Sequence, residues 1–273
     1  MAYSIELFAR EPIIFERERL LSAMRNRLGN VDSPEPKSEG ATQMFLLNDH
    51  IAHFTDGSIP AQLVLLPASG GPDPDKYTEA LQQSWSFRNA ADVLATCGHS
   101  CLFSDMMSAA LPQQTRRHIL AQGLLAVLEC LHIDAIYFVE TQQFMSPAHL
   151  FAELNTPPQI ANPTAGFLNV RFFNVANSPG DMVMDTLGLA SFSLTDLQLH
   201  FHGLEPNDAA RVLHATASYV FDRGDVIENG HTIQGRVPDE RWSCRPEESL
   251  LEPKRPVLDI NPGAPYAAGR RAA

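Results

Sequence analysis

The chain has 273 residues and carries 32 acidic against 20 basic side chains, a formal net charge of −12 at pH 7. A surface this acidic repels phosphate groups, so general nucleic-acid binding and attachment to anionic membranes are disfavoured. Four cysteines are too few for a disulfide scaffold and suit a reducing compartment. The N-terminal residues show no secretory signal pattern, and no window reaches the ~18 apolar residues that a membrane-spanning helix needs. We therefore expect a cytoplasmic protein that binds neither nucleic acid nor membranes.

The first half of the chain, residues 1–155, predicts helices together with single strands and a meander of three short strands. Its strongest pattern is an apolar stripe at helical spacing, which predicts a long helix over 112–132. The turn dipeptide Asn48-Asp49 is expected to separate two short strands. The other elements expected here are strands at 3–9, 44–47, 51–55, 62–66, 99–104 and 133–140, and helices at 12–28, 75–85, 87–96 and 146–154.

A loop over 155–163 is expected to separate this half from a second set of elements. That set consists of strands at 166–175, 182–187 and 194–202, a helix at 206–222, and a hairpin over 226–235 that turns at Asn229-Gly230. Six prolines follow Arg236 and rule out a regular helix there. We therefore predict an N-terminal α+β half over 1–155, a C-terminal strand and helix half over 163–235, and a proline-rich extended tail over 236–273. The tail would wrap the body or reach a partner.

The order of the expected elements indicates the fold class. Antiparallel meanders that are segregated from helices are typical of an α+β fold rather than a doubly wound α/β fold. We expect antiparallel or mixed sheets with helices on one face, an arrangement that two ferredoxin-like halves would satisfy. Whether the second half, which has roughly 110 residues with its tail, folds alone stays open.

Three strings in the second half carry a family resemblance. They read MDTLGL at 184–189, LTDLQLHF at 194–201 and DVIENGHTIQG at 225–235. Together they resemble bacterial proteins of domain-of-unknown-function family 4261, and the resemblance would cover most of residues 42–235. It implies no reaction, cofactor or catalytic residue. Because some members of the family are found near secretion and contact-toxin genes, the resemblance implies a binding or immunity-like role.

One strand segment contains the best candidate for a chemical site. In an extended strand over 196–202, Asp196, Gln198, His200 and His202 share one face. The Cα atoms of His200 and His202 would lie roughly 6.5–7 Å apart, so both imidazoles could reach one zinc ion. Asp196 would lie ~13 Å from His200 along the strand, which is too far to join the same site.

A third metal ligand would have to come from a neighbouring segment, where Asp185 and His231 are the candidates. A metal-dependent hydrolase could use this polar cluster, which comprises Asp185, Asp196, His200, His202 and His231. The alternative is that these side chains line the solvent-facing side of an antiparallel strand, where alternating polar residues need no function. Asp185 and Asp196 likewise fit either a general acid and base pair or turn-forming side chains.

Other motifs give weaker signals. Cys97 and Cys101 would lie ~13 Å apart on a strand, too far to bind one zinc ion, so buried thiols are expected. Arg116 and Arg117 stand early in the long helix, where cations oppose the macrodipole, so we expect them to contact Asp105 or an acidic partner. The sequence contains no P-loop, dinucleotide fingerprint, nucleophile elbow or His-Glu-x-x-His motif.

These observations favour a non-enzymatic cytoplasmic module that binds another protein, as an immunity-like or secretion-associated accessory protein would. The negative charge, the lack of catalytic motifs and the proline-rich extension support this interpretation. It requires no cofactor. The alternative is a metal-dependent hydrolase or metal-binding protein that holds zinc through His200 and His202, and the oligomeric state stays open in both cases.

Overall fold

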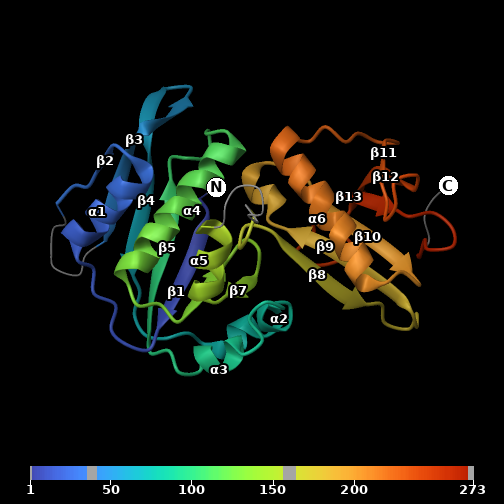
Figure 1. Cartoon of the computed structure of the whole chain (residues 1–273), viewed down its shortest axis with the longest axis horizontal. Coiled ribbons are helices and arrows are strands. Elements are labelled where there is room, and N and C mark those ends of the chain that lie inside the picture. The colour runs from blue at the N-terminus through green and yellow to red at the C-terminus, as the bar shows by residue number, and fades with distance from the viewer. Residues whose placement is uncertain (1, 36–41, 156–163, 270–273) are drawn as a thin grey trace. The chain divides into compact units, whose positions relative to one another are not determined.

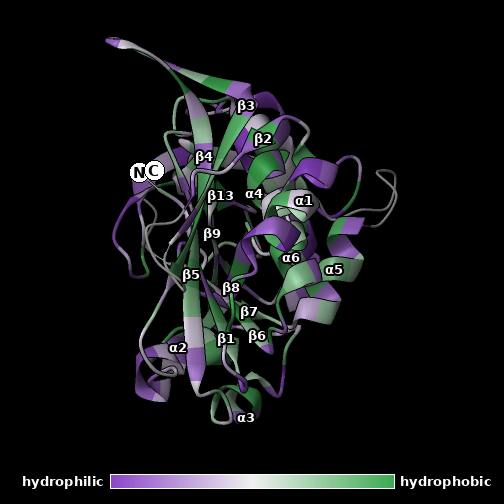
Figure 2. Ribbon diagram, turned by 90° about the vertical axis from the view of Figure 1, so that its left-hand side faces the viewer, coloured by the Kyte–Doolittle hydropathy of each residue, from purple (hydrophilic) through white to green (hydrophobic). Residues whose placement is uncertain are grey.

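The computed structural model describes residues 2–35, 42–155 and 164–269, and the chain divides into two compact units, Met1–Phe167 and Leu168–Ala273 (Figure 1). Each unit contains a sheet and helices of its own, which confirms the α+β class. Hydrophobic residues concentrate in the strands, whereas the tip of the β3–β4 hairpin is hydrophilic (Figure 2). None of the helices in the described parts of the chain has the length and apolarity to span a membrane.

The first unit is built around a seven-stranded sheet in the order β2-β3-β4-β5-β1-β6-β7, in which neighbouring strands run antiparallel. Helices α1 and α4 pack against each other. The strands are β1 (Ser4–Ala9), β2 (Val31–Asp32), β3 (Gln43–Phe54), β4 (Gly57–Pro67), β5 (His99–Met106), β6 (Ala135–Phe138) and β7 (Gln143–Met145). The helices are α1 (Arg17–Leu28), η1 (Pro74–Tyr77), α2 (Thr78–Gln82), α3 (Ala90–Leu94), α4 (Gln113–Cys130) and α5 (Pro147–Asn155).

The centre of this sheet has a ferredoxin-like topology. The chain order β1-α1-β4-β5-α4-β6 and the spatial order β4-β5-β1-β6 together make two crossovers on an antiparallel sheet. Strands β2 and β3 extend one edge of this core, and β7 extends the other. The long helix predicted over 112–132 is confirmed as α4.

Several elements of the first unit differ from the sequence-based prediction, among them β2 and β7, for which no strand was predicted. The strands expected at 44–47 and 51–55 form the single strand β3, which has an irregularity between Leu47 and Ile51. A β-bulge inserts extra residues without ending the pairing, so turn-forming residues such as Asn48 and Asp49 fit within one strand. The helix expected over 75–85 is divided into η1 and α2.

Arg116 contacts Asp105, which is one of the two outcomes that the sequence allowed. Its Nε donates to Oδ2 at 2.6 Å and its Nη2 to Oδ1 at 3.1 Å, and both side chains are buried. The backbone N–H of Tyr3 also donates to Oδ1 of Asp105, at 2.6 Å. This carboxylate therefore ties the start of α4 to the ends of β1 and β5.

The second unit contains a six-stranded mixed sheet in the order β11-β12-β13-β10-β9-β8, in which β10 and β13 run parallel. Helix α6 follows β10 and packs over β8, β9 and β10 (Figure 1). This strand order is not ferredoxin-like. The elements are β8 (Asn169–Asn174), β9 (Asp181–Leu187), η2 (Leu189–Phe192), β10 (Asp196–His202), α6 (Pro206–Arg223), β11 (Thr232–Gln234), β12 (Arg241–Glu248) and β13 (Pro256–Asn261).

The segment over 236–273, predicted as an extended tail, supplies β12 and β13 to this sheet. Its prolines are tolerated because Pro256 begins a strand and Pro246 lies in β12 beyond the residues that pair with β11. The strand pairing expected for a hairpin over 226–235 also differs from the structure, in which β11 pairs with β12 and not with the residues that precede β11. Residues 156–163 of the expected interdomain loop lie outside the described residues.

Candidate functional site

Five neighbouring strands of the second sheet each contribute one residue to a polar row. The register places the residues side by side in the order Arg171 on β8, Asp185 on β9, Gln198 on β10, Asp259 on β13 and Arg245 on β12. Residues that are paired in this way point to the same face of a sheet. All except Arg245 are at most 4% exposed, so the row is buried.

Two arginines bind the carboxylates at the centre of this region. Arg171 donates to both oxygens of Asp185, at 2.9 and 2.6 Å, and Nη2 of Arg255 donates to Oδ2 of the same residue at 2.8 Å. Arg255 also donates through Nε to Oδ2 of Asp196, at 3.1 Å. Arg255 therefore bridges the two carboxylates that were considered as an acid and base pair.

The polar row is buried by the loop over 249–255, which connects β12 to β13. The N–H of Leu250 donates to Oε1 of Gln198 at 2.7 Å, and Nη2 of Arg171 donates to the carbonyl of Glu252 at 2.8 Å. The prediction of a solvent-facing strand side is therefore wrong for Asp196 and Gln198, which are 1% and 0% exposed. Alternation along a strand shows which residues share a face, but the covering loop lies about fifty residues further along the chain.

The environment of Asp196 keeps its carboxyl group away from water. Burial raises the pKa of Asp196 to about 6, against the opposing effects of the Arg255 guanidinium and of hydrogen bonds from the Thr186 hydroxyl and the Leu189 N–H. Asp185 is 0% exposed and already binds two guanidinium groups. The carboxylates of Asp185, Asp196 and Asp259 therefore accept hydrogen bonds from side chains of the same sheet or of its covering loop.

The predicted metal ligands are not assembled around one point. His202 Nδ1 lies 2.9 Å from Oδ1 of Asp181, and His200 Nε2 lies 4.0 Å from Oδ2 of the same residue. Sequence reasoning missed Asp181, although pairing of β9 with β10 places it directly opposite His202. His231 precedes β11 at the far edge of the sheet, where its Nδ1 accepts the N–H of Glu228 at 3.1 Å. In the described ranges, no three His, Cys, Asp or Glu side chains form a group that could hold a metal ion.

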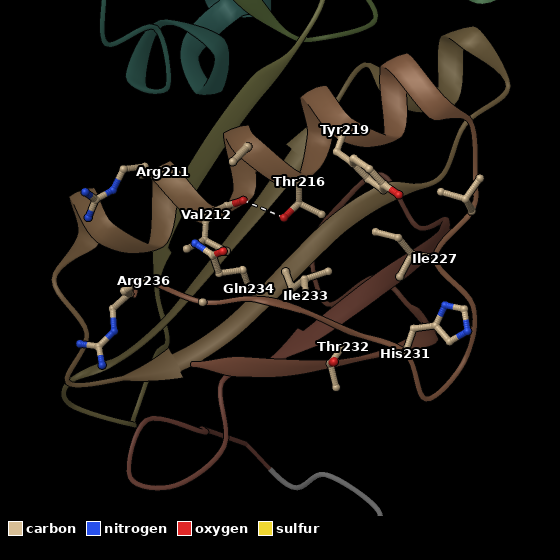
Figure 3. A pocket seen from close by; sticks show the side chains of 13 residues that line it. Arg211, Val212, Thr216, Tyr219, Ile227, His231, Thr232, Ile233, Gln234 and Arg236 are labelled. Atoms are coloured by element: carbon tan, nitrogen blue, oxygen red, sulfur yellow. Dashed lines mark hydrogen bonds between the residues drawn. The ribbon is translucent and has the colours of Figure 1, made fainter. Parts of the chain in front are cut away.

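A groove of about 620 Å³ lies between α6 and the segment over 226–236 (Figure 3). Figure 3 shows Tyr219 on α6 and Ile227 and Ile233 on the facing segment pointing toward the space between them. The lining residues are Arg211, Val212, Ala215, Thr216, Tyr219, Val226, Ile227, His231, Thr232, Ile233, Gln234, Gly235 and Arg236. Sequence reasoning identified His231 but not the groove, because its two walls come from different elements.

The α6 wall of the groove has a regular pattern. Arg211, Ala215 and Tyr219 are exposed and recur every four residues, so they form one stripe along the helix. Ala215 is small and stands between two long side chains, which leaves space at the middle of the wall. The Thr216 hydroxyl donates to the carbonyl of Val212 at 2.8 Å, within the helix (Figure 3).

The charges in the groove are positive. Among the residues that the structure describes, its lining includes Arg211, Arg236 and His231 but no Asp or Glu, in a chain whose net charge is −12. The two arginines lie at the same end of the groove, one on each wall (Figure 3). Each has a carboxylate partner outside the lining, Asp208 for Arg211 and Glu240 for Arg236.

Strand β11 forms the open edge of the sheet beside this groove. His231 and Gly235 flank this strand, and both form backbone hydrogen bonds on the side of β12. The N–H of Cys244 donates to the carbonyl of His231 at 2.8 Å, and the N–H of Gly235 donates to the carbonyl of Glu240 at 2.9 Å. Bonded and non-bonded positions alternate in an antiparallel ladder, so the N–H and C=O groups of Thr232 and Gln234 point away from β12. No hydrogen bond to these outward groups occurs within the part of the chain that the structure describes.

One family model matches part of the second unit. No curated protein and no solved structure matches the chain. Residues 185–261 match the model of a family described as "Domain of unknown function (DUF4261)", a stretch that runs from β9 to the end of β13 and includes the groove. The resemblance found in the sequence is therefore confirmed over residues 185–261, which are similar to the DUF4261 family. The match does not include residues 42–184, over which the resemblance was expected to extend, and it continues past residue 235 into the segment predicted as a tail.

Proposed function

We propose that this chain is a non-enzymatic protein-binding module, and that the groove between α6 and β11 binds an extended segment of a partner protein. The observation that carries the proposal is a groove lined by apolar and basic side chains and bordered by a strand edge whose outward backbone groups are available for pairing. An immunity-like or secretion-associated accessory protein, the role implied by the resemblance, would bind its partner through this surface.

The composition of the groove supports binding more than catalysis. Its lining contains no Asp, Glu, Cys or Ser, and the hydroxyl of Thr216 is bonded to the helix backbone. Three exposed side chains along α6, from Arg211 to Tyr219, span about 12 Å at the helical rise of roughly 1.5 Å per residue. An extended chain of about four residues covers this length at ~3.3 Å per residue.

The test uses a display library of random linear peptides, selected against the full chain. Peptides that bind the purified wild-type protein are then measured against two variants. Ala215→Trp fills the middle of the groove from an exposed position on α6. Ala190→Trp makes the same substitution at an exposed position of η2 outside the groove.

We expect the selected peptides to bind the Ala190→Trp variant within about twofold of wild type and to lose at least about tenfold in affinity for Ala215→Trp, because the indole occupies their site. Circular dichroism checks that both variants fold. The proposal fails if no peptide is enriched, or if the enriched peptides bind the folded Ala215→Trp variant as well as they bind wild type.

A further inference from the structure

We infer that the partner segment binds by adding a strand to β11, and that it carries an acidic side chain at the end of the groove where Arg211 and Arg236 lie. This inference rests on the proposed function and specifies the binding mode and the chemistry of the partner. Three independent features of the second unit lead to it: the edge of the sheet, the alternation of side chains and the distribution of charge.

The edge of β11 provides the backbone contacts. Thr232 and Gln234 each present an N–H and a C=O away from β12, two residues apart, which is the spacing that a paired strand matches. Both residues are exposed, so an incoming chain can reach them without opening the fold. Addition of a strand to an open sheet edge draws affinity from such main-chain hydrogen bonds.

The groove next to this edge provides the side-chain contacts. Successive side chains of an added strand point to opposite faces, so every second one would enter the groove and the others would face solvent. The groove offers Ile227 and Ile233 on one wall and Tyr219 on the other. The expected partner segment therefore has apolar side chains at alternate positions.

The distribution of charge favours an acidic residue in that segment. The whole chain is strongly acidic, but this groove is lined by two arginines and no carboxylate. Arg236 donates through Nε and Nη2 to Glu240 and lies 4.5 Å from the centre of the Tyr266 ring, and Arg211 pairs with Asp208, so an acidic side chain of the partner would join or replace these contacts. Because both arginines lie at one end of the groove, the acidic residue should occupy one end of the bound segment (Figure 3).

The first test is the sequence of the selected peptides and its response to charge reversal. We expect enrichment of Asp or Glu at one end of an alternating apolar pattern. Arg211→Glu should weaken such peptides by about tenfold at low salt, because it turns attraction into repulsion. Arg223→Glu makes the same charge change at an exposed position of α6 outside the groove, and we expect it to change affinity by less than about twofold.

The second test probes the main-chain bonds with synthetic versions of one selected peptide. N-methylation of the amides that pair with β11 should weaken binding about fivefold or more for each bond lost, whereas N-methylation of the intervening amides should leave it within about twofold. Alternating sensitivity along the peptide is the signature of strand addition.

The outcomes separate this inference from the proposed function. One result would overturn the inference and leave the protein-binding proposal standing. In this result, the peptides lose affinity for the Ala215→Trp variant, but they lack an acidic residue, bind the Arg211→Glu variant as well as wild type, or tolerate N-methylation at every amide. If the library yields no peptide that is sensitive to Ala215→Trp, both are overturned.

Discussion

Arg255 joins the covering loop to two carboxylates that lie on neighbouring strands. Its Nη2 donates to Asp185 and to the Thr186 carbonyl, at 2.8 and 2.7 Å, and its Nε donates to Asp196. Removing one partner of a buried ion pair leaves an uncompensated charge, which costs about 3–5 kcal/mol. Loss of the Arg255 side chain should therefore destabilise the second unit.

We predict that Arg255→Met lowers the free energy of unfolding of the second unit by about 3 kcal/mol. The chain has two tryptophans, and Trp242, 0% exposed, belongs to this unit. Its fluorescence in a Trp85→Phe background therefore follows urea unfolding of the second unit. Arg223→Met, at an exposed position of α6, should change stability by less than about 0.5 kcal/mol, and equal effects of the two substitutions would contradict a structural role for the polar row.

Glu140 makes the stability of the first unit depend on pH. Burial raises the pKa of Glu140 from the 4.5 of an ordinary glutamate to about 7, although its Oε1 accepts the N–H of Ser4 at 2.9 Å. The pKa of Glu140 is higher in the folded than in the unfolded protein, so the folded protein binds this proton more tightly. The contribution of the protonated group to stability is therefore fully present below about pH 4.5 and is lost as the pH rises through about 7.

We predict that Glu140→Gln raises the free energy of unfolding at pH 8 relative to wild type by at most about 3 kcal/mol, while the two proteins differ little at pH 4.5. Glutamine keeps the oxygen that accepts the Ser4 N–H but carries no charge. Urea unfolding followed by circular dichroism at both pH values gives the comparison. A variant that is less stable than wild type at pH 8 would show that the charged form is the favoured one.

At the scale of elements, α4 lies so close to the first sheet that a side chain at Gly123 would crowd its neighbours. A Cβ atom on Gly123 would lie 2.3 Å from Cδ1 of Leu63 and 3.1 Å from Cζ of Phe103, and both of these side chains are 0% exposed. Alanine improves helix propensity by about 1 kcal/mol, but added volume in a packed interior costs about 1–3 kcal/mol.

We therefore predict that Gly123→Ala destabilises the first unit by about 1 kcal/mol despite its better helix propensity. Thermal unfolding followed by circular dichroism measures the change. A rise in the melting temperature would mean that Leu63 and Phe103 can move aside and that the contact is looser than the structure indicates.

The sequence predicted the elements that depend on local patterns. The apolar stripe of α4 and the alternation in β10 depend on periods of 3.6 and two residues, which a single sequence displays directly. The same alternation did not show that Asp196 and Gln198 are buried, because their cover comes from the loop over 249–255. The prolines after Arg236 predicted an extended tail, because the sequence does not show that Pro246 lies in a part of β12 with no partner strand on one side, where proline is tolerated.

The candidate site was predicted less well than the fold. The sequence predicted a polar cluster that includes Asp185, Asp196 and His200, and it offered Asp185 as a metal ligand or, with Asp196, as an acid and base pair, but it did not predict that the two carboxylates are buried ion-pair partners. Arg171 and Arg255, which bind these carboxylates, lie far from them in the chain and carried no motif. The groove was missed for a related reason: it depends on α6 lying across from β11, and no local pattern encodes that.

At the scale of the whole molecule, the alternative of a zinc-dependent hydrolase makes a separate prediction. The residues predicted as third zinc ligands do not lie in a common site, because Asp185 binds two arginines and His231 lies near the opposite edge of the sheet from Asp181. We expect protein purified without chelator to contain less than about 0.1 zinc per chain, and added zinc to leave its melting temperature unchanged. Stoichiometric zinc that is lost on substitution of His200 and His202 would reinstate the alternative.

The most direct measurement of strand addition is amide hydrogen exchange of the full chain, with and without a saturating selected peptide. The account predicts that the amides of Thr232 and Gln234 slow by at least about tenfold on binding, because they gain hydrogen bonds, while those of β8 at the opposite sheet edge stay unchanged. A bound peptide that leaves the exchange of Thr232 and Gln234 unaltered would contradict it.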